Sequence, residues 1–138
     1  MESPYPSDGR AKVLIVDDDP VVLALVREWL DGAGYDVSVR DQALGTAQVV
    51  ANQQPDFVLL DVRMPALSGG ELTQLIRRNQ STAKSAVILH SVMEFEPLSE
   101  LARTTGALGI IKKTPNQKLF LAEFERLVVR HRVSKSTR

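Results

Sequence analysis

The sequence contains no cysteine, which excludes a disulfide framework and any metal site built on thiolates. It also has no excess of charge of either sign: 17 basic residues balance 17 acidic ones, which argues against bulk attraction to nucleic acid or to an anionic membrane. No apolar run approaches the roughly 20 residues that cross a bilayer, and the start of the chain has no apolar segment of the signal-peptide type. We therefore expect a soluble, cytoplasmic protein whose 138 residues form one domain.

What the sequence does have is a series of short, almost continuously apolar runs. They cover residues 12–16, 35–39, 56–60, 86–90 and 108–111. Continuous apolarity, as opposed to alternation, is typical of strands that are buried on both faces, as in a parallel sheet covered by helices. The pattern predicts five such strands.

Amphipathic segments between and after these runs predict helices. The first begins at Pro20, with Asp19 as its cap, and is stopped by Gly32 and Gly34. The others are expected at 42–52, capped by Asp41, and at 71–79, 94–105 and 116–129. Five strands alternating with five helices through right-handed crossovers predict a doubly wound α/β sandwich. The domain is expected to span residues 11–130, between a flexible leader at 1–10 and a basic, fraying tail at 131–138.

Acidic residues stand at the carboxyl ends of two predicted strands. Asp17 and Asp18 follow the first strand, and Asp61 follows the third. The carboxyl ends of parallel strands lie together at one edge of the sheet, so the three carboxylates would repel one another strongly without a cation among them. Mg2+ prefers oxygen ligands, and a magnesium site is therefore favoured over a purely structural role. Asp19 is interpreted separately, as a helix cap.

Asp61 is the candidate for the reactive group. The next predicted helix starts too far along the chain for Asp61 to cap it, and a carboxylate beside a metal can act as the nucleophile in phosphoryl transfer. The backbone carbonyl of Arg63 could complete the metal site. Ser91 and Lys113 follow the fourth and fifth strands and could contact a phosphoryl group. Each is weak evidence alone, since Ser91 also suits a helix cap and Lys113 a surface charge.

These residues carry a resemblance to a known family. The segments Val-Asp-Asp-Asp-Pro at 16–20, Leu-Leu-Asp-Val-Arg-Met-Pro at 59–65, Leu-His-Ser at 89–91 and Gly-Ala at 106–107 followed by Lys113 resemble the response-regulator receiver domain of two-component signal transduction. The similarity covers about residues 11–130. It implies a (βα)5 flavodoxin-like fold with a five-stranded parallel sheet in the order 2-1-3-4-5, and a signalling module that is not an enzyme.

The same resemblance implies a role for each site residue. Asp61 would accept a phosphoryl group from a histidine kinase or a phosphotransfer protein, in a phosphorelay. Ser91 and Lys113 would contact that group. The residues implied to hold Mg2+ are Asp17, Asp18 and Asp61, the last two directly, and Arg63 through its backbone carbonyl.

Three positions depart from the family pattern. Ile110 stands three residues before the lysine, where receivers carry an aromatic residue that swings inward on activation, so we expect Ser91 to carry most of a subtler switch. Val92 follows the serine in place of alanine or glycine and could narrow access to the phosphoacceptor. Thr114 separates the lysine from Pro115, which puts the usual cis peptide at that joint in doubt.

Two other functions stay open at this point. A phosphohydrolase of the haloacid-dehalogenase type would use Asp17 as nucleophile and Asp19 as acid/base, together with Ser91 and Lys113. In that enzyme, however, a later acidic pair would be needed to hold the metal, and Asp61 would have no role. A degenerate receiver would act only as a protein-binding module, which the complete set of site residues argues against.

The sequence says less about partners. It ends about eight residues after the last predicted helix, so we expect no DNA-binding domain and a separate output protein. That protein, or a second copy in a possible homodimer, is expected on the face formed by the fourth helix, the fifth strand and the fifth helix. A phosphorelay shuttle is equally compatible. His90 is interpreted as a packed or surface histidine, Trp29 as a core residue, and Gly69 and Gly70 as loop residues.

Overall fold

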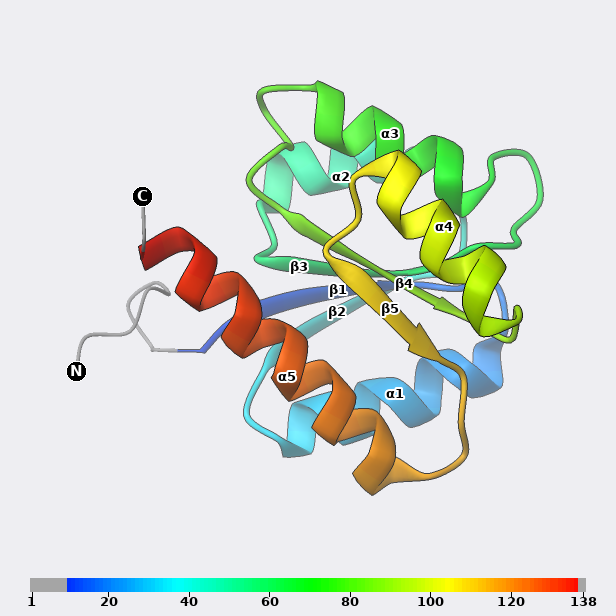
Figure 1. The fold of residues 1–138 in the computed structure, drawn as a ribbon, viewed down its shortest axis with the longest axis vertical. Helices are drawn as coiled ribbons and strands as arrows, with labels where there is room; N and C mark the ends of the chain where they lie inside the picture. The colour runs from blue at the N-terminus through cyan, green and yellow to red at the C-terminus, as the bar shows by residue number, and fades with distance from the viewer. Residues whose placement is uncertain (1–9, 137–138) are drawn as a thin grey trace.

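Five strands and five helices alternate along the chain in the computed structural model, which describes residues 10–136 (Figure 1). The strands are Lys12–Val16 (β1), Asp36–Arg40 (β2), Phe57–Asp61 (β3), Ala86–Ser91 (β4) and Gly109–Lys112 (β5). The helices are Pro20–Gly32 (α1), Thr46–Gln53 (α2), Gly69–Arg78 (α3), Phe95–Thr105 (α4) and Gln117–Ser136 (α5). The predicted alternation is confirmed.

The sheet is parallel throughout, and its strand order is β2-β1-β3-β4-β5. This is the order that the family resemblance implies. Helices α1 and α5 cover one face, and α2, α3 and α4 cover the other (Figure 1). The central position of β1 and β3 places the residues that follow them side by side at the carboxyl edge of the sheet.

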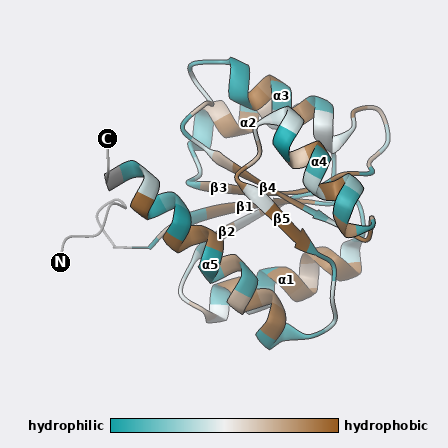
Figure 2. Cartoon of the chain, in the orientation of Figure 1, coloured by the Kyte–Doolittle hydropathy of each residue, from teal (hydrophilic) through white to brown (hydrophobic). Residues whose placement is uncertain are grey.

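The core has two layers because alternate strand residues point to opposite faces of the sheet. In β3, Phe57 and Leu59 pack on the side of α1 and α5, while Val58 and Leu60 pack on the other. Brown and teal residues accordingly alternate along the helices, as expected for helices that bury one face (Figure 2). Strands β1, β3 and β4 are buried on both faces, which explains their continuous apolar runs, whereas the edge strands β2 and β5 are only partly buried.

Trp29 belongs to the packed interior, as expected, and so does His90, for which the sequence left a surface position open. The side chain of His90 is buried, and its ring centroid lies 5.5 Å from that of Phe120 on α5. Burial, with a smaller contribution from the positive charge of Lys113, lowers the pKa of His90 to about 3. The imidazole is therefore neutral at physiological pH and behaves as a core side chain.

Helix α1 begins as the sequence predicts. The side chain of Asp19 accepts a hydrogen bond from the backbone N of Val21 (2.9 Å), Pro20 occupies the first turn, and the helix ends at Gly32. An aspartate at this position satisfies one of the free N–H groups of the first helical turn.

Helix α2 begins at Thr46, four residues later than predicted, and the assignment of Asp41 as its cap is wrong. The residue before the helix is Gly45, whose positive φ of 83° marks a turn. Arg40, at the end of β2, organises this turn through hydrogen bonds from Nε to Oγ1 of Thr46 (2.9 Å) and from Nη2 to the carbonyl of Leu44 (2.5 Å). A tertiary contact therefore sets this boundary.

Helix α3 begins at Gly69, so the interpretation of Gly69 and Gly70 as loop residues is wrong. Ser68 and Glu71 form a capping box: the N of Glu71 donates to Oγ of Ser68 (3.2 Å), and the N of Ser68 donates to Oε1 of Glu71 (3.3 Å). This reciprocal cap is strong enough to start a helix on two glycines.

Helix α5 is longer than predicted and continues through residues 131–136. The expectation of a fraying tail from residue 131 is therefore wrong for these residues, while 137–138 lie outside the described part of the chain. The ring of His131 packs edge-on against Phe57, with centroids 5.4 Å apart, and so ties the helix extension to β3. Of the predicted leader, residues 1–9 also lie outside the described residues.

Across residues 10–136, no helix is both long and apolar enough to cross a membrane.

The close contact between α3 and β3 gives a testable prediction about Gly69. A Cβ added there would lie 2.6 Å from the carbonyl O of Asp61 and 2.7 Å from Cα of Val62, both backbone atoms that cannot easily move. We expect Gly69→Ala to lower the free energy of unfolding by about 1–3 kcal/mol, as overpacking usually does. Gly32→Ala is the control: a Cβ at Gly32 meets nothing within 4 Å, so this variant should be neutral or more stable by up to about 1 kcal/mol. Urea denaturation measures the stability of the two variants. Equal losses of stability in Gly69→Ala and Gly32→Ala would contradict the prediction.

Candidate functional site

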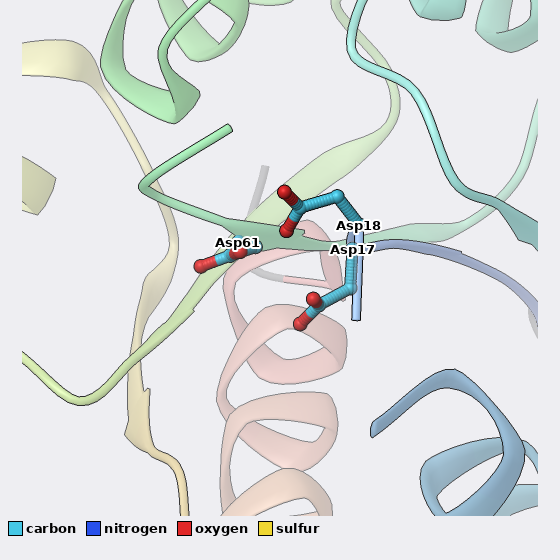
Figure 3. A group of neighbouring side chains, drawn as sticks. All are labelled: Asp17, Asp18 and Asp61. Carbon is cyan, nitrogen blue, oxygen red and sulfur yellow. The ribbon is translucent and has the colours of Figure 1, made fainter. Parts of the chain in front are cut away.

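Three carboxylates meet at the carboxyl edge of the sheet (Figure 3). Asp17 and Asp18 follow β1, and Asp61 ends β3, the strand beside it. One carboxylate oxygen from each residue lies within 4.8 Å of the others. Asp17 and Asp61 are buried, with 1% and 6% of their surface exposed, whereas Asp18 is exposed. The predicted convergence of these residues is confirmed.

Lys113 reaches the same cluster from the loop after β5. Its Nζ lies 2.9 Å from Oδ2 of Asp17 and 3.5 Å from Oδ1 of Asp61. The backbone N of Lys113 also donates to the carbonyl of Ser91 (2.9 Å), which fixes the loop against β4. Sequence reasoning placed Lys113 near a phosphoryl group but did not identify Asp17 as its nearest partner.

Burial and neighbouring charge act against ionisation of Asp61. Desolvation is the largest cause of its raised pKa, followed by repulsion from Asp17, and Lys113 offsets only part of the two. For Lys113, burial favours the neutral amine, but its hydrogen bond and charge interaction with Asp17, together with the charge of Asp61, raise the pKa overall. The cluster thus holds more negative charge than one lysine compensates.

Local backbone hydrogen bonds orient the two buried carboxylates. The backbone N of Asp19 donates to Oδ1 of Asp17 (2.9 Å), and the N of Arg63 donates to Oδ1 of Asp61 (3.4 Å). Both bonds span two residues and are typical of the turns that aspartate forms. The other oxygen of Asp17, Oδ2, contacts the ammonium of Lys113. The use of the Arg63 carbonyl as a metal ligand stays a prediction.

Ser91 lies at the same edge of the sheet as the last residue of β4. It is 1% exposed, and it follows His90, whose Cα pairs with that of Asp61 in the sheet. Its Oγ accepts a hydrogen bond from the backbone N of Met93 (3.1 Å). This bond links Ser91 to the loop that leads into α4, and it is the local turn that serine side chains form with the N–H two residues on.

The donor set fits a hard divalent cation. Carboxylate oxygens are the ligands that Mg2+ prefers, and three of them converge here from two neighbouring strands. A cation at this place would also relieve the repulsion that raises the pKa of Asp61. The residues that would hold it are Asp17, Asp18 and Asp61.

The structure shows where the three positions that depart from the receiver pattern lie. Ile110 is half-buried in β5 and packs against the core layer that contains α4. Val92 is 66% exposed, so most of its side chain lies in solvent. Among residues 10–136 no peptide bond is cis, and the bond between Thr114 and Pro115 is therefore trans.

A family model described as the response regulator receiver domain matches residues 13–125. The chain belongs to this family. The receiver is 34% identical over 139 residues to the C4-dicarboxylate transport transcriptional regulatory protein DctD of Pseudomonas aeruginosa, covering 94% of this chain and 29% of DctD. It is 28% identical over 143 residues to the DNA-binding response regulator MtrA of Mycolicibacterium smegmatis, covering 91% of this chain and 63% of MtrA. The chain thus spans only part of the length of these relatives.

Solved receiver structures share the fold. The chemotaxis response regulator CheY4 of Vibrio cholerae superimposes with a TM-score of 0.79 at 24% identity, covering 86% of this chain and 98% of that one. A CheY-like response regulator receiver domain protein from Methanospirillum hungatei gives a TM-score of 0.80 at 22% identity, covering 91% and 98%. Family membership argues against the haloacid-dehalogenase alternative, as does Asp19, whose side chain caps α1.

The raised pKa of Asp61 predicts that its negative charge destabilises the metal-free receiver at neutral pH. The folded state binds the proton more tightly than the unfolded chain does, so this cost is present above the raised pKa and disappears as the pH falls through it. We expect Asp61→Asn to raise the melting temperature at pH 7 without metal, by roughly 3 °C for each 1 kcal/mol gained. The gain should shrink on acidification.

The control is Asp36→Asn, which removes an exposed carboxylate on β2. Thermal melts in a chelator should show no comparable gain for this variant. An Asp61→Asn protein that melts at or below the parent temperature would contradict the electrostatic interpretation.

Proposed function

We propose that this receiver accepts a phosphoryl group on Asp61 from a phosphohistidine of a histidine kinase or phosphotransfer protein, in a reaction that requires Mg2+. The observation that carries the proposal is the meeting of Asp17, Asp18 and Asp61 with the ammonium of Lys113 at one edge of the sheet. A buried carboxylate beside a cation site and a lysine is the arrangement that phosphoryl transfer to an aspartate needs.

The chemistry balances without an additional reactant. A carboxylate oxygen of Asp61 attacks phosphorus, an O–P bond forms, and the P–N bond to the donor imidazole breaks. The electron pair of that bond stays on the imidazole nitrogen, which is a good leaving group once protonated. The product is an aspartyl phosphate and a free histidine.

The residues of the site supply charge and position. Mg2+, when bound by the carboxylates, neutralises charge on the transferring oxygens. Lys113 pairs with Asp17 in the metal-free site and lies close enough to Asp61 to contact a phosphoryl oxygen there. Lysine suits this role because its ammonium is a compact charge on a flexible stem. Ser91 is the proposed hydroxyl donor to a second phosphoryl oxygen.

Phosphorylation would act by changing an interaction with a separate output protein or with a second copy of the chain. The surface proposed for this contact is the face formed by α4, β5 and α5, where Phe95 and Leu119 are exposed by 62% and 51%. Exposed apolar side chains around an edge strand are suited to a reversible contact. The relative MtrA is, by its name, a DNA-binding response regulator.

The proposal predicts that Asp61 is labelled by a small phosphodonor. With acetyl phosphate and Mg2+, intact-mass spectrometry should show addition of one phosphoryl group to the parent. Asp61→Asn should lose the label, while Asp36→Asn should keep it because that carboxylate is exposed on β2, away from the site. A label that is still added to Asp61→Asn would instead indicate Asp17 as the nucleophile. Absence of any label on the parent would instead support a receiver that serves only as a binding module.

Two adjacent aspartates offer a matched test of the metal site. Asp18 contributes an oxygen to the cluster, whereas the side chain of Asp19 caps α1. We expect Asp18→Ala to weaken Mg2+ binding at least about tenfold, the loss seen even for outer partners of a metal site, with little loss of stability. Asp19→Ala should keep its Mg2+ affinity and lose about 1 kcal/mol of stability. Titration with Mg2+ measures the affinity of each variant, and urea denaturation measures its stability. Equal Mg2+ affinity in the two variants would show that Asp18 is not a ligand.

A further inference from the structure

A cavity lies at the amino edge of the sheet, across the molecule from the carboxylate cluster. Its volume is about 470 Å3. Its walls include Ala86 and Val87 at the start of β4, Leu108 just before β5, and the last turns of α3 and α5. In Figure 1 this end of α5 lies away from the strand arrowheads, where Asp17 and Asp61 are found. Small-molecule sites typically enclose roughly 300–1,000 Å3, so the cavity has the size of a ligand site.

Three cationic side chains line this cavity. They are Arg77 in the last turn of α3, Lys84 in the loop before β4 and Lys135 in the last turn of α5, and no acidic residue is among the walls that the structure describes. None of the three forms an ion pair with another described residue. A neighbouring hollow contains Asp56, but Oδ2 of this carboxylate accepts a hydrogen bond from the backbone N of Lys12 (2.8 Å).

The helix dipoles explain only part of this charge. Basic residues in a last turn offset the negative end of a helix, which accounts for Arg77 and Lys135. Lys84 lies outside the helices and has no such role. Positive charge gathered in a concave place attracts anions.

Arg77 is held in a position suited to binding an anion. Its Nη1 donates to the carbonyl of Ala83 (2.6 Å), which ties it to the loop before β4. Its Cγ lies 3.5 Å from the place that a Cβ would take on Gly106, so the stem of the side chain runs against the glycine that ends α4. A guanidinium has five N–H donors, and those not used by Ala83 can bind two phosphate oxygens side by side.

The remaining walls favour an organic ligand. Ala86, Val87 and Leu108 are apolar, and the imidazole of His131 lies beside them, where it also packs against Phe57. Inorganic phosphate would leave these walls uncovered. A ligand that also carries a flat ring would cover the apolar side chains and pack against the imidazole.

We propose that this cavity binds a small organic phosphate, of about the size of a nucleoside monophosphate. Arg77, Lys84 and Lys135 bind the phosphate, and the organic part packs on the apolar walls beside His131. Binding is reversible, and no covalent bond forms or breaks. The inference does not depend on phosphorylation of Asp61, because the cavity lies at the opposite edge of the sheet.

The test is a titration with three probes, adenosine monophosphate, inorganic phosphate and adenosine, at constant ionic strength and in a chelator. Backbone amide shifts report where each probe binds. We expect adenosine monophosphate to shift the amides of 83–87, 106–108 and 131–135. Inorganic phosphate should bind at least about tenfold more weakly, because it buries no apolar wall, and adenosine should bind more weakly still.

Three results would contradict the proposal. Equal affinity for the two phosphates would show that the organic part makes no contact. Adenosine that binds as tightly as its monophosphate would show that the cations have no role. If no probe at millimolar concentration shifts these amides, the cavity is not a site for organic phosphates.

Two double variants that remove equal charge provide the matched control. Arg77→Gln with Lys84→Gln should weaken binding of adenosine monophosphate at least about tenfold, since hydrogen bonds to charged groups are lost. Arg78→Gln with Lys118→Gln removes two exposed cations that lie outside the cavity walls and should keep the parent affinity. Equal losses in the two variants would show that the attraction is unspecific and refute the site.

A third double variant separates binding from folding. Because Arg77 also bonds to the carbonyl of Ala83, Lys84→Gln with Lys135→Gln removes cavity charge and keeps that bond. It should weaken binding to a similar extent with an unchanged melting temperature, and unchanged affinity would refute the site. Labelling of Asp61 by acetyl phosphate should be the same in this variant as in the parent, so that the proposed function is tested separately.

Discussion

The repulsion between Asp17 and Asp61 is the constraint on which the site depends. Two carboxylates that are almost entirely removed from water lie at the ends of adjacent strands, and the ammonium of Lys113 contacts both. Charge interactions are much stronger in such a place than in solvent. The metal-free site therefore favours the binding of positive charge. An anionic group that enters it must bring a cation or displace Lys113 from Asp17 or Asp61.

The topology explains how residues nearly a hundred positions apart form this cluster. Because β1 and β3 are neighbours at the centre of the sheet, Asp17 and Asp61 meet without any long loop, and β5 brings Lys113 to the same edge. The loops on this edge are held by short backbone bonds, such as that from Lys113 N to the Ser91 carbonyl. Rigid strands thus set the positions of the charges, while the loop after β4 is held to the strand end by the bond from Met93 N to Ser91 Oγ.

The central part of the fold could be predicted from the sequence because its causes are local. Continuous apolar runs reveal strands buried on two faces, and Asp19 before Pro20 reveals the start of α1. The start of α2 could not be predicted, since it depends on Arg40 contacting Thr46 from a strand end. The extension of α5 likewise depends on a tertiary contact, that of His131 with Phe57. In the site, the acids were identifiable from their place after strands, but the pairing of Lys113 with Asp17 depends on side-chain conformation, which no pattern of residue types encodes.

Helix α5 can also be considered as a lever. Its 20 residues span about 30 Å, so that one end begins four residues after Lys113 and the other reaches past Phe57 toward the opposite edge of the sheet. Two contacts support the helix along its length. Its far end contacts Phe57, and near its middle Leu127 packs directly against Gly109 of β5. A tilt of about 5° at the start of a helix this long would displace its far end by about 2.5 Å. A tilt of this size beside the carboxylates would then displace the opposite end of the helix by about 2.5 Å.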